Sequence, residues 1–171
     1  MSTQTNLAYL AGGCYWGMEE LFRVIPGVIK TQVGFSGGHI PNVAYREVTT
    51  GTTGHAETLM LEFDPIQVTY EHLLFEFFRL HNPTKPNQQG NDIGTQYRSA
   101  IFYVDEVQKT IAQNVIHTVN ASGEWGAPIC TELTPFNAFY PAEEKHQKYI
   151  MKFPDGYTCH FRHDLKLGEG G

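Results

Sequence analysis

Apolar and polar positions in the first part of the chain switch between the period of a strand and that of a helix. Residues 6–11 are a short apolar run, which predicts a buried strand, and two glycines break the run. Apolar residues then recur at helical spacing over residues 16–22, until a Pro-Gly pair ends the segment. Residues 28–35 alternate again, so the predicted order is strand, tight turn, helix and strand.

The same order of elements repeats further along the chain. Residues 58–63 alternate as a strand, and Thr69 opens a helix whose apolar residues share one side. Residues 99–104 predict another strand, residues 105–120 an amphipathic helix, and residues 129–133 a further strand. Two β-α-β passes with antiparallel strands between them predict an α+β fold. We expect a two-layer α/β sandwich with helices on a mixed sheet and a ferredoxin-like core.

Two stretches, residues 39–55 and residues 82–98, lack periodicity and are predicted to be loops. The second is rich in Pro, Gly, Asn and Gln and is too long for a plain connection, and such loops commonly carry function. A chain of 171 residues has the usual size of one domain. We therefore expect a single domain, with a catalytic core over about residues 6–152 and an irregular, flexible tail over residues 153–171.

The charge balance narrows the choice of partners. The chain has 12 basic and 18 acidic residues, and no run of Lys or Arg supplies the positive stripe that nucleic-acid binding needs. The N-terminus lacks a basic start followed by an apolar stretch, and no apolar run approaches about 18 residues. We therefore expect a cytoplasmic protein with no nucleic-acid partner and no membrane partner.

Three cysteines, Cys14, Cys130 and Cys159, are widely spaced and odd in number, which does not suit a disulfide framework. The eight histidines show no metal-binding spacing, so neither a metal nor a cofactor is expected. Cys130 falls in the strand predicted over residues 129–133, where we expect a buried, inert side chain. At least one of the other two thiols is therefore expected to be reactive.

Cys14 directly follows two glycines at the predicted strand-to-helix turn. A sulfur at this position faces the unpaired N–H groups and the positive end of the helix, which lower the pKa of a thiol. Tyr15 and Trp16 come next, and two large aromatic residues beside a nucleophile can wall a pocket for an apolar group. The turn is therefore the candidate site of nucleophilic chemistry.

Several segments resemble those of one enzyme family. Residues 13–17 read GCYWG and resemble the GCFWG signature of the A-type methionine sulfoxide reductases (MsrA), with Tyr15 in place of the usual Phe. The resemblance extends, in the same order, from about residue 7 to residue 157. Further segments carry it: Tyr45-Arg46, Gly54-His55-Ala56-Glu57, residues 90–99 (GNDIGTQYRS) and residues 141–147 (PAEEKHQ).

The resemblance implies a peptide-methionine (S)-S-oxide reductase, which reduces the S epimer of methionine sulfoxide, protein-bound or free, as antioxidant protein repair. Cys14 is then the nucleophile, which becomes a sulfenic acid. Glu57 matches the acid of the family. A sulfoxide needs its oxygen protonated before a thiolate attacks sulfur, and a dry pocket favours the neutral carboxyl that can supply the proton.

The resemblance also assigns the polar and apolar walls of the pocket. Tyr45 and Tyr97 match tyrosines whose hydroxyls hold the sulfoxide oxygen, and Asp92 matches a carboxylate that orders this network. Tyr15 and Trp16 are then expected to hold the S-methyl group by apolar contact. Hydrogen-bond donors aimed at a developing negative oxygen are most effective in such a dry site.

Turnover requires a second thiol to attack the sulfenic acid. Cys159 lies in the Gly-containing tail and is the candidate resolving cysteine, although the sequence around it departs from the usual pattern of the family. If Cys159 does not serve, an external thiol attacks directly in a one-cysteine cycle. Either route makes thioredoxin or a similar dithiol the expected partner of a monomeric enzyme.

Two other classes of function remain open from the residues alone. One is a cysteine hydrolase, with Cys14 as nucleophile, His55 as base and Asp92 as the group that orients the base. The other is a non-catalytic module whose aromatic pocket only binds methionine-containing segments. The two glycines beside the thiol argue against the second class.

Overall fold

The computed structural model describes residues 4–155 and 160–169. A six-stranded sheet is built from β1 (Asn6–Gly12), β2 (Val28–Ser36), β3 (Ala56–Phe63), β6 (Ser99–Tyr103), β7 (Glu132–Pro135) and β8 (Phe139–Pro141). Two short strands, β4 (Gln88–Gln89) and β5 (Asp92–Ile93), pair separately. The helices are α1 (Tyr15–Phe22), α2 (Tyr45–Val48), α3 (Tyr70–Leu80), α4 (Glu106–Ser122) and α5 (Tyr149–Lys152), with 3-10 turns η1 (Thr95–Tyr97) and η2 (Glu144–His146).

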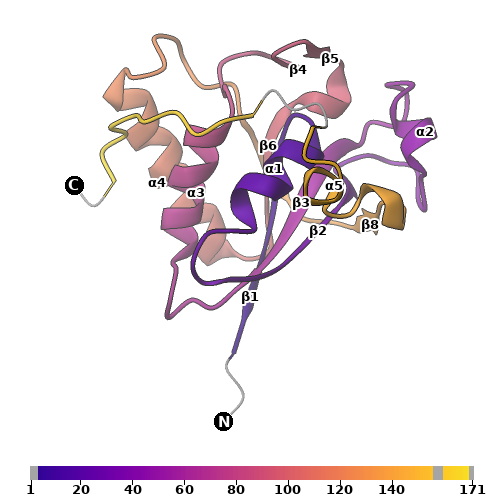
Figure 1. Ribbon diagram of the computed structural model, residues 1–171. Helices are drawn as coiled ribbons and strands as arrows, with labels where there is room; N and C mark the ends of the chain where they lie inside the picture. The colour runs from indigo at the N-terminus through magenta and orange to yellow at the C-terminus, as the bar shows by residue number, and fades with distance from the viewer. Residues whose placement is uncertain (1–3, 156–159, 170–171) are drawn as a thin grey trace.

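The strand order of the sheet is β7-β6-β1-β3-β2-β8 (Figure 1). β1 runs antiparallel to both of its neighbours, β3 and β6, and β3 is also antiparallel to β2. It follows that β1 is parallel to β2, and β3 is parallel to β6, each pair being separated by one strand and joined through a helix. This is the split β-α-β arrangement of a ferredoxin-like core, and it confirms the predicted α+β fold with a mixed sheet.

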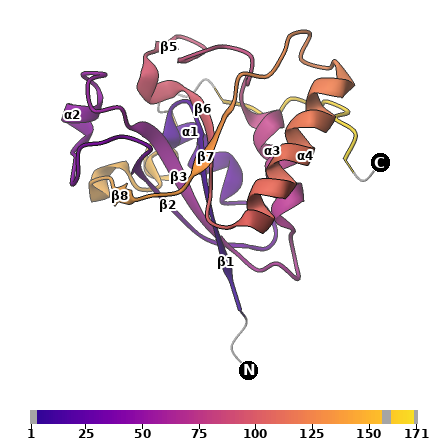
Figure 2. The ribbon, with the colours of Figure 1, turned by 180° about the vertical axis from the view of Figure 1, so that it is seen from behind.

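Side chains of β1 alternate between two cores, as the period of a strand requires. Ala8 and Leu10 face the main core, which includes buried side chains of α1, α3 and α4. Tyr9 and Ala11 face a smaller cluster on the other side of the sheet, where the Tyr9 ring stacks on Phe136 at 3.9 Å. Figure 2 shows the molecule from behind, with the two edge strands of the sheet, β7 and β8, in view. The helices thus form one layer and the sheet the other.

Local hydrogen bonds explain where the two long helices begin. The Thr69 side chain accepts from the His72 N–H at 3.0 Å, and the Asp105 side chain accepts from the Gln108 N–H at 2.8 Å. Thr and Asp are favoured N-cap residues because they satisfy otherwise unpaired N–H groups. The predicted starts of α3 and α4 are confirmed.

The predicted strand over residues 129–133 was placed too early, and the expectation for Cys130 was wrong. Parallel pairing with β6 begins only at Glu132. The Cys130 N–H instead donates to the Pro83 carbonyl at 2.9 Å, so the chain here follows a loop rather than β6, and Cys130 is exposed.

Short elements occupy the predicted loops. α2 lies within residues 39–55, and β4, β5 and η1 lie within residues 82–98, while β8 and α5 were not predicted at all. Elements of two to four residues carry too little periodicity for a pattern to register.

The described part of the tail, residues 160–169, contains no helix or strand, as expected, but it packs against the body of the protein. Leu167 is buried in the main core. Glu169 pairs with Arg79 of α3 at 3.0 Å, and Arg162 pairs with Glu76 of the same helix at 2.9 Å. Separately, no helix in the described residues combines the length and apolar character needed to cross a membrane.

Candidate active site

The candidate site lies at the end of the sheet where β1 stops and its two neighbours start (Figure 1). Gly12, the last residue of β1, pairs with Ser99, the first residue of β6. On the other side, Leu10 pairs with Leu59, and extending this register by two residues brings Gly12 opposite Glu57. Antiparallel pairing therefore places the turn after β1 beside the starts of β3 and β6.

Cys14 occupies the N-cap position of α1, directly after this turn, and is 7% exposed. Gly13 makes the turn possible because its φ of +96° disfavours any residue with a side chain. A Cβ atom at Gly13 would also lie 2.7 Å from the Gln89 side chain. The sulfur atom thus begins the helix at its positive end, as the sequence predicts.

Glu57 lies beside the thiol and is 1% exposed. Its Oε1 accepts the Tyr15 N–H, the first N–H of α1, at 3.2 Å. Burial raises the pKa of Glu57 to about 8, the Tyr15 hydrogen bond opposes this rise, and the charge of Asp92 adds to it. The carboxyl group is therefore mostly neutral at pH 7. Because Oε1 accepts a hydrogen bond, Oε2 is the oxygen that carries the proton.

Two tyrosines and one aspartate converge on the same place from separate loops. Burial, followed by the charges of Glu57, Cys14 and Asp92, raises the pKa of Tyr45 to about 12. The pKa of Tyr97 is also raised, first by burial and then by Glu57, Tyr45, Asp92 and Cys14. Both hydroxyls therefore stay protonated and can donate hydrogen bonds. Glu57, Cys14 and Asp92 therefore each lie near both tyrosines.

Tyr15 and Trp16, the first two residues of α1, contribute rings in different ways. Tyr15 is fully buried and packs at 5.7 Å from Phe35 of β2, so it forms the floor of the site. Trp16 is partly buried and stacks on Tyr149 of α5 at 3.9 Å. Sequence reasoning missed Tyr149.

His146 is a second residue that the sequence reasoning did not assign to the site. Its Nδ1 accepts the indole N–H of Trp16 at 3.1 Å, and its ring lies 4.4 Å from that of Tyr45. Because Nδ1 accepts, the proton of the neutral ring is on Nε2. The segment over residues 141–147 carried the family resemblance, and that resemblance was the available signal for His146.

Three buried polar atoms of these residues have no hydrogen-bond partner within the part of the chain that the structure describes: Tyr15 Oη, Glu57 Oε2 and His146 Nε2. A buried polar atom without a partner costs on the order of 1–3 kcal/mol, so most folded proteins contain few of them. Three such atoms on adjacent side chains indicate a site arranged for an external polar group. A sulfoxide oxygen has the acceptor character that protonated Glu57 requires.

His55 does not act as a base toward Cys14. Its Nδ1 accepts the Gly38 N–H at 3.0 Å, and its Nε2 lies 2.6 Å from the Ile40 carbonyl oxygen, to which it must donate. Both ring nitrogens therefore form hydrogen bonds with the backbone of the loop after β2, and neither is available to accept a proton from Cys14. The arrangement does not support the cysteine hydrolase.

The candidate resolving residue, Cys159, lies outside the described residues. The next residue, His160, is buried, and its Nε2–H donates to the Gly12 carbonyl at 2.6 Å. Burial lowers the pKa of His160, so its ring is neutral at pH 7. The tail is thus attached to the turn that precedes Cys14.

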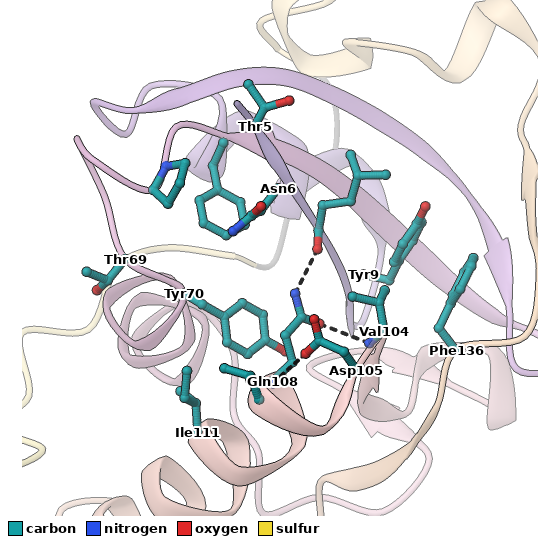
Figure 3. Close-up of a pocket in the computed structure, with 14 residues that line it drawn as sticks. Thr5, Asn6, Tyr9, Thr69, Tyr70, Val104, Asp105, Gln108, Ile111 and Phe136 are labelled. Atoms are coloured by element: carbon teal, nitrogen blue, oxygen red, sulfur yellow. Dashed lines mark hydrogen bonds between the residues drawn. The ribbon is translucent and has the colours of Figure 1, made fainter. Parts of the chain in front are cut away.

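A cavity of about 600 Å³ opens elsewhere, between β1 and the first turns of α3 and α4 (Figure 3). The polar groups around it are committed to the fold, because Asp105 caps α4 and the Gln108 amide donates to the Leu7 carbonyl at 2.9 Å. Its described lining residues include no cysteine or histidine. Nor do the described residues of the whole chain contain a group of His, Cys, Asp and Glu that could hold a metal ion.

Comparison with known families gives a match over nearly the whole chain. Residues 6–169 match the model of the peptide methionine sulfoxide reductase family. The chain is 52% identical over 161 residues to the peptide methionine sulfoxide reductase MsrA of Streptomyces coelicolor, which covers 94% of this chain and 91% of the relative.

Solved structures of similar proteins have the same fold. Mxr1 of Saccharomyces cerevisiae in its reduced form matches with a TM-score of 0.90 and 34% identity, covering 96% of this chain and 95% of that chain. Methionine sulfoxide reductase A of Corynebacterium diphtheriae matches with a TM-score of 0.82 and 39% identity, covering 98% of this chain and 84% of that chain. Mxr1 has also been solved in complex with Trx2. That structure matches with a TM-score of 0.65 and 22% identity, covering 96% of this chain and 94% of that chain.

Proposed function

The chain belongs to the peptide methionine sulfoxide reductase family and is an oxidoreductase that acts on methionine sulfoxide, and from this premise we propose that Cys14 reduces the S epimer. The substrate is methionine sulfoxide in oxidised proteins or as the free amino acid. One observation carries the assignment of roles: the neutral carboxyl group of Glu57 is bound to the first N–H of the helix that Cys14 caps. A proton donor and a nucleophile are thereby held side by side.

The first half of the reaction transfers the sulfoxide oxygen to the enzyme. The thiolate of Cys14 attacks the sulfur of the substrate while Glu57 protonates the sulfoxide oxygen from Oε2. This attack forms a bond between the two sulfur atoms. The hydroxyl then moves to the Cys14 sulfur, so the S–O bond of the substrate and the new S–S bond both break, methionine leaves, and Cys14 becomes a sulfenic acid. The positive end of α1 favours the thiolate, and burial favours the protonated acid.

Tyr45 and Tyr97 hold the oxygen during this transfer. Their raised pKa values keep both hydroxyls protonated, so they donate hydrogen bonds to the oxygen as it gains negative charge. Asp92 orders these hydroxyls, and Trp16 and Tyr15 contact the S-methyl group. The preference for the S epimer is supported by the resemblance of residues 13–17 to the A-type signature.

A racemic N-acetyl methionine sulfoxide amide tests the proposed function directly. With dithiothreitol as reductant, we expect the purified protein to consume the S epimer and leave the R epimer, because the thiol and the acid approach one face of the sulfur. Chromatographic separation of the two epimers measures both. Consumption of neither epimer, or of both at equal rates, would contradict the proposal.

A second thiol regenerates Cys14 in the other half of the cycle, and Cys159 is the proposed source. Its sulfur attacks the sulfenic acid, releases water and forms a Cys14–Cys159 disulfide. A dithiol such as thioredoxin then reduces this disulfide. Two observations support this route: His160, the neighbour of Cys159, is bound to the turn beside Cys14, and the yeast relative has been solved in complex with Trx2.

The Cys159→Ser variant is expected to retain turnover with dithiothreitol but to lose turnover with thioredoxin by at least about tenfold, because a tethered thiol has a large effective concentration. The His160→Ala variant is expected to show a smaller loss of the same kind, since the tail is no longer bound to Gly12. His160→Gln, which keeps a donor, provides the matched control. Unchanged thioredoxin turnover in Cys159→Ser would indicate the one-cysteine cycle instead.

A further inference from the structure

Aromatic rings connect the candidate site to the protein surface. Tyr149 stacks on Trp16 with ring centroids 3.9 Å apart and planes 14° apart. Phe153 also packs against Tyr149, with ring centroids 5.1 Å apart and planes 42° apart. We name Trp16, Tyr149 and Phe153 the aromatic ladder. Its inner ring, Trp16, belongs to the candidate site, and its outer ring, Phe153, is 55% exposed.

The ladder is held in place by hydrogen bonds at each step. The indole N–H of Trp16 donates to His146. Glu19 of α1 accepts the N–H of Lys148, the residue before α5, so the two helices that carry the ladder are joined (Figure 1). The Phe153 N–H donates to the Tyr149 carbonyl at 2.8 Å. The exposure of Phe153 therefore belongs to an ordered surface.

An exposed ring continuous with a substrate pocket can bind what extends from that pocket. The methionine sulfoxide side chain reaches only the inner end of the ladder. In an extended peptide, neighbouring residues are spaced by about 3.3 Å, so residues one or two positions away can reach the outer end. Met151, on the same short helix, is also exposed and adds apolar surface.

We propose that Phe153 binds an apolar side chain of the substrate polypeptide, one or two residues away from the oxidised methionine. The protein thereby distinguishes methionine sulfoxide in apolar segments, such as those exposed when a damaged protein unfolds, from methionine sulfoxide in polar segments. This inference rests on the proposed function, because it requires the sulfoxide to bind beside Trp16. Phe153 is a specificity residue and takes no part in the chemistry.

Two peptide series test the proposal, each containing the S epimer of methionine sulfoxide at the centre. In one series a phenylalanine occupies each of the two positions on either side in turn, and in the other a serine does. Dithiothreitol is the reductant, so no protein reductant competes for the surface. For at least one position we expect wild type to favour phenylalanine by about fivefold in kcat/KM, the size expected from burying roughly 40 Å² of apolar surface.

The Phe153→Ala variant is expected to lose this preference through KM, while its activity on the N-acetyl methionine sulfoxide amide stays unchanged. Phe161→Ala is the matched control, because Phe161 is also an exposed phenylalanine, at 59%, and lies outside the ladder. The control is expected to keep the preference.

Three results would overturn the inference while leaving the proposed function intact. They are the absence of any preference in wild type, a preference that survives in Phe153→Ala, and an equal loss in Phe161→Ala. If Phe153→Ala instead lowered only thioredoxin-driven turnover of the small amide, the outer ring would be a surface for the reductant, and the inference would also fail. Loss of amide reduction by wild type would contradict the proposed function itself.

Discussion

The Cys14→Ser variant is expected to lose reduction of methionine sulfoxide by at least about 10⁴-fold, because a serine hydroxyl at neutral pH supplies almost no anionic nucleophile. The fold should persist, since Cys14 is the N-cap of α1 and serine is among the residues favoured at that position. Release of methionine from the N-acetyl amide, measured with dithiothreitol, gives the rate. Circular dichroism shows whether the variant is folded.

Cys130→Ser is the matched control for this substitution. Cys130 is exposed and bonds to the Pro83 carbonyl, remote in sequence from every residue of the site, so we expect wild-type activity. Substantial activity in Cys14→Ser would show that another group attacks the sulfoxide. The assignment of the nucleophile would then be wrong, although the family membership would stand.

The Glu57→Gln variant is expected to lower kcat by about 10²- to 10⁴-fold, the usual contribution of a general acid. Glutamine has nearly the same shape and still accepts the Tyr15 N–H, so the loss reports the missing proton rather than a changed fold. Glu62→Gln, a partly exposed position on the same strand, is expected to retain activity. Equal losses in the two variants would point to a general effect on β3.

The pH dependence of Glu57 distinguishes an acid from a structural residue. Its folded pKa of about 8 lies above the ordinary value of 4.5, so the group is protonated below pH 8 and ionises above it. In wild type, kcat/KM is therefore expected to fall as pH rises through about 8, and the residual rate of Glu57→Gln should lack this fall. A descending limb that remains in Glu57→Gln would assign the titration to another group.

The same shift affects stability, with a defined sign. Between pH 4.5 and pH 8 the folded protein keeps a proton on Glu57 that the unfolded chain has lost. The contribution of Glu57 to the free energy of unfolding is therefore fully present below pH 4.5 and is lost as pH rises through 8. Thermal unfolding of wild type and Glu57→Gln at pH 5 and pH 9 measures this difference.

The sequence predicted the ferredoxin-like core because its strands and helices are long enough to show their periods. It also placed Cys14 correctly at the start of a helix, since two glycines between an apolar strand and a helical run leave few alternatives. The prediction that Glu57, Tyr45, Tyr97 and Asp92 share a site with Cys14 came from the family resemblance. The antiparallel register of β1 with β3 and β6 is the physical reason why such distant residues meet.

Other features depended on tertiary contacts that no local pattern records. Cys130 looked like a residue of a buried strand, but pairing with the Pro83 carbonyl holds it in a loop. Tyr149 belongs to the short helix α5, which packs against α1, and His146 belongs to the short turn η2 and accepts a hydrogen bond from Trp16 of α1. Their contacts with Trp16, a hydrogen bond accepted by His146 and ring stacking from Tyr149, depend on the three-dimensional structure and leave no pattern in the sequence.

The attachment of the tail at both ends has a consequence for competition between thiols. His160 is bound to Gly12, Glu169 is bound to Arg79, and only residues 156–159 separate Asp155 from His160. The sulfur of Cys159, the proposed resolving thiol, directly precedes His160 in the chain and therefore has an effective concentration at Cys14 on the order of millimolar or above. Small thiols in solution would intercept the sulfenic acid of Cys14 only when their own concentration reaches that range.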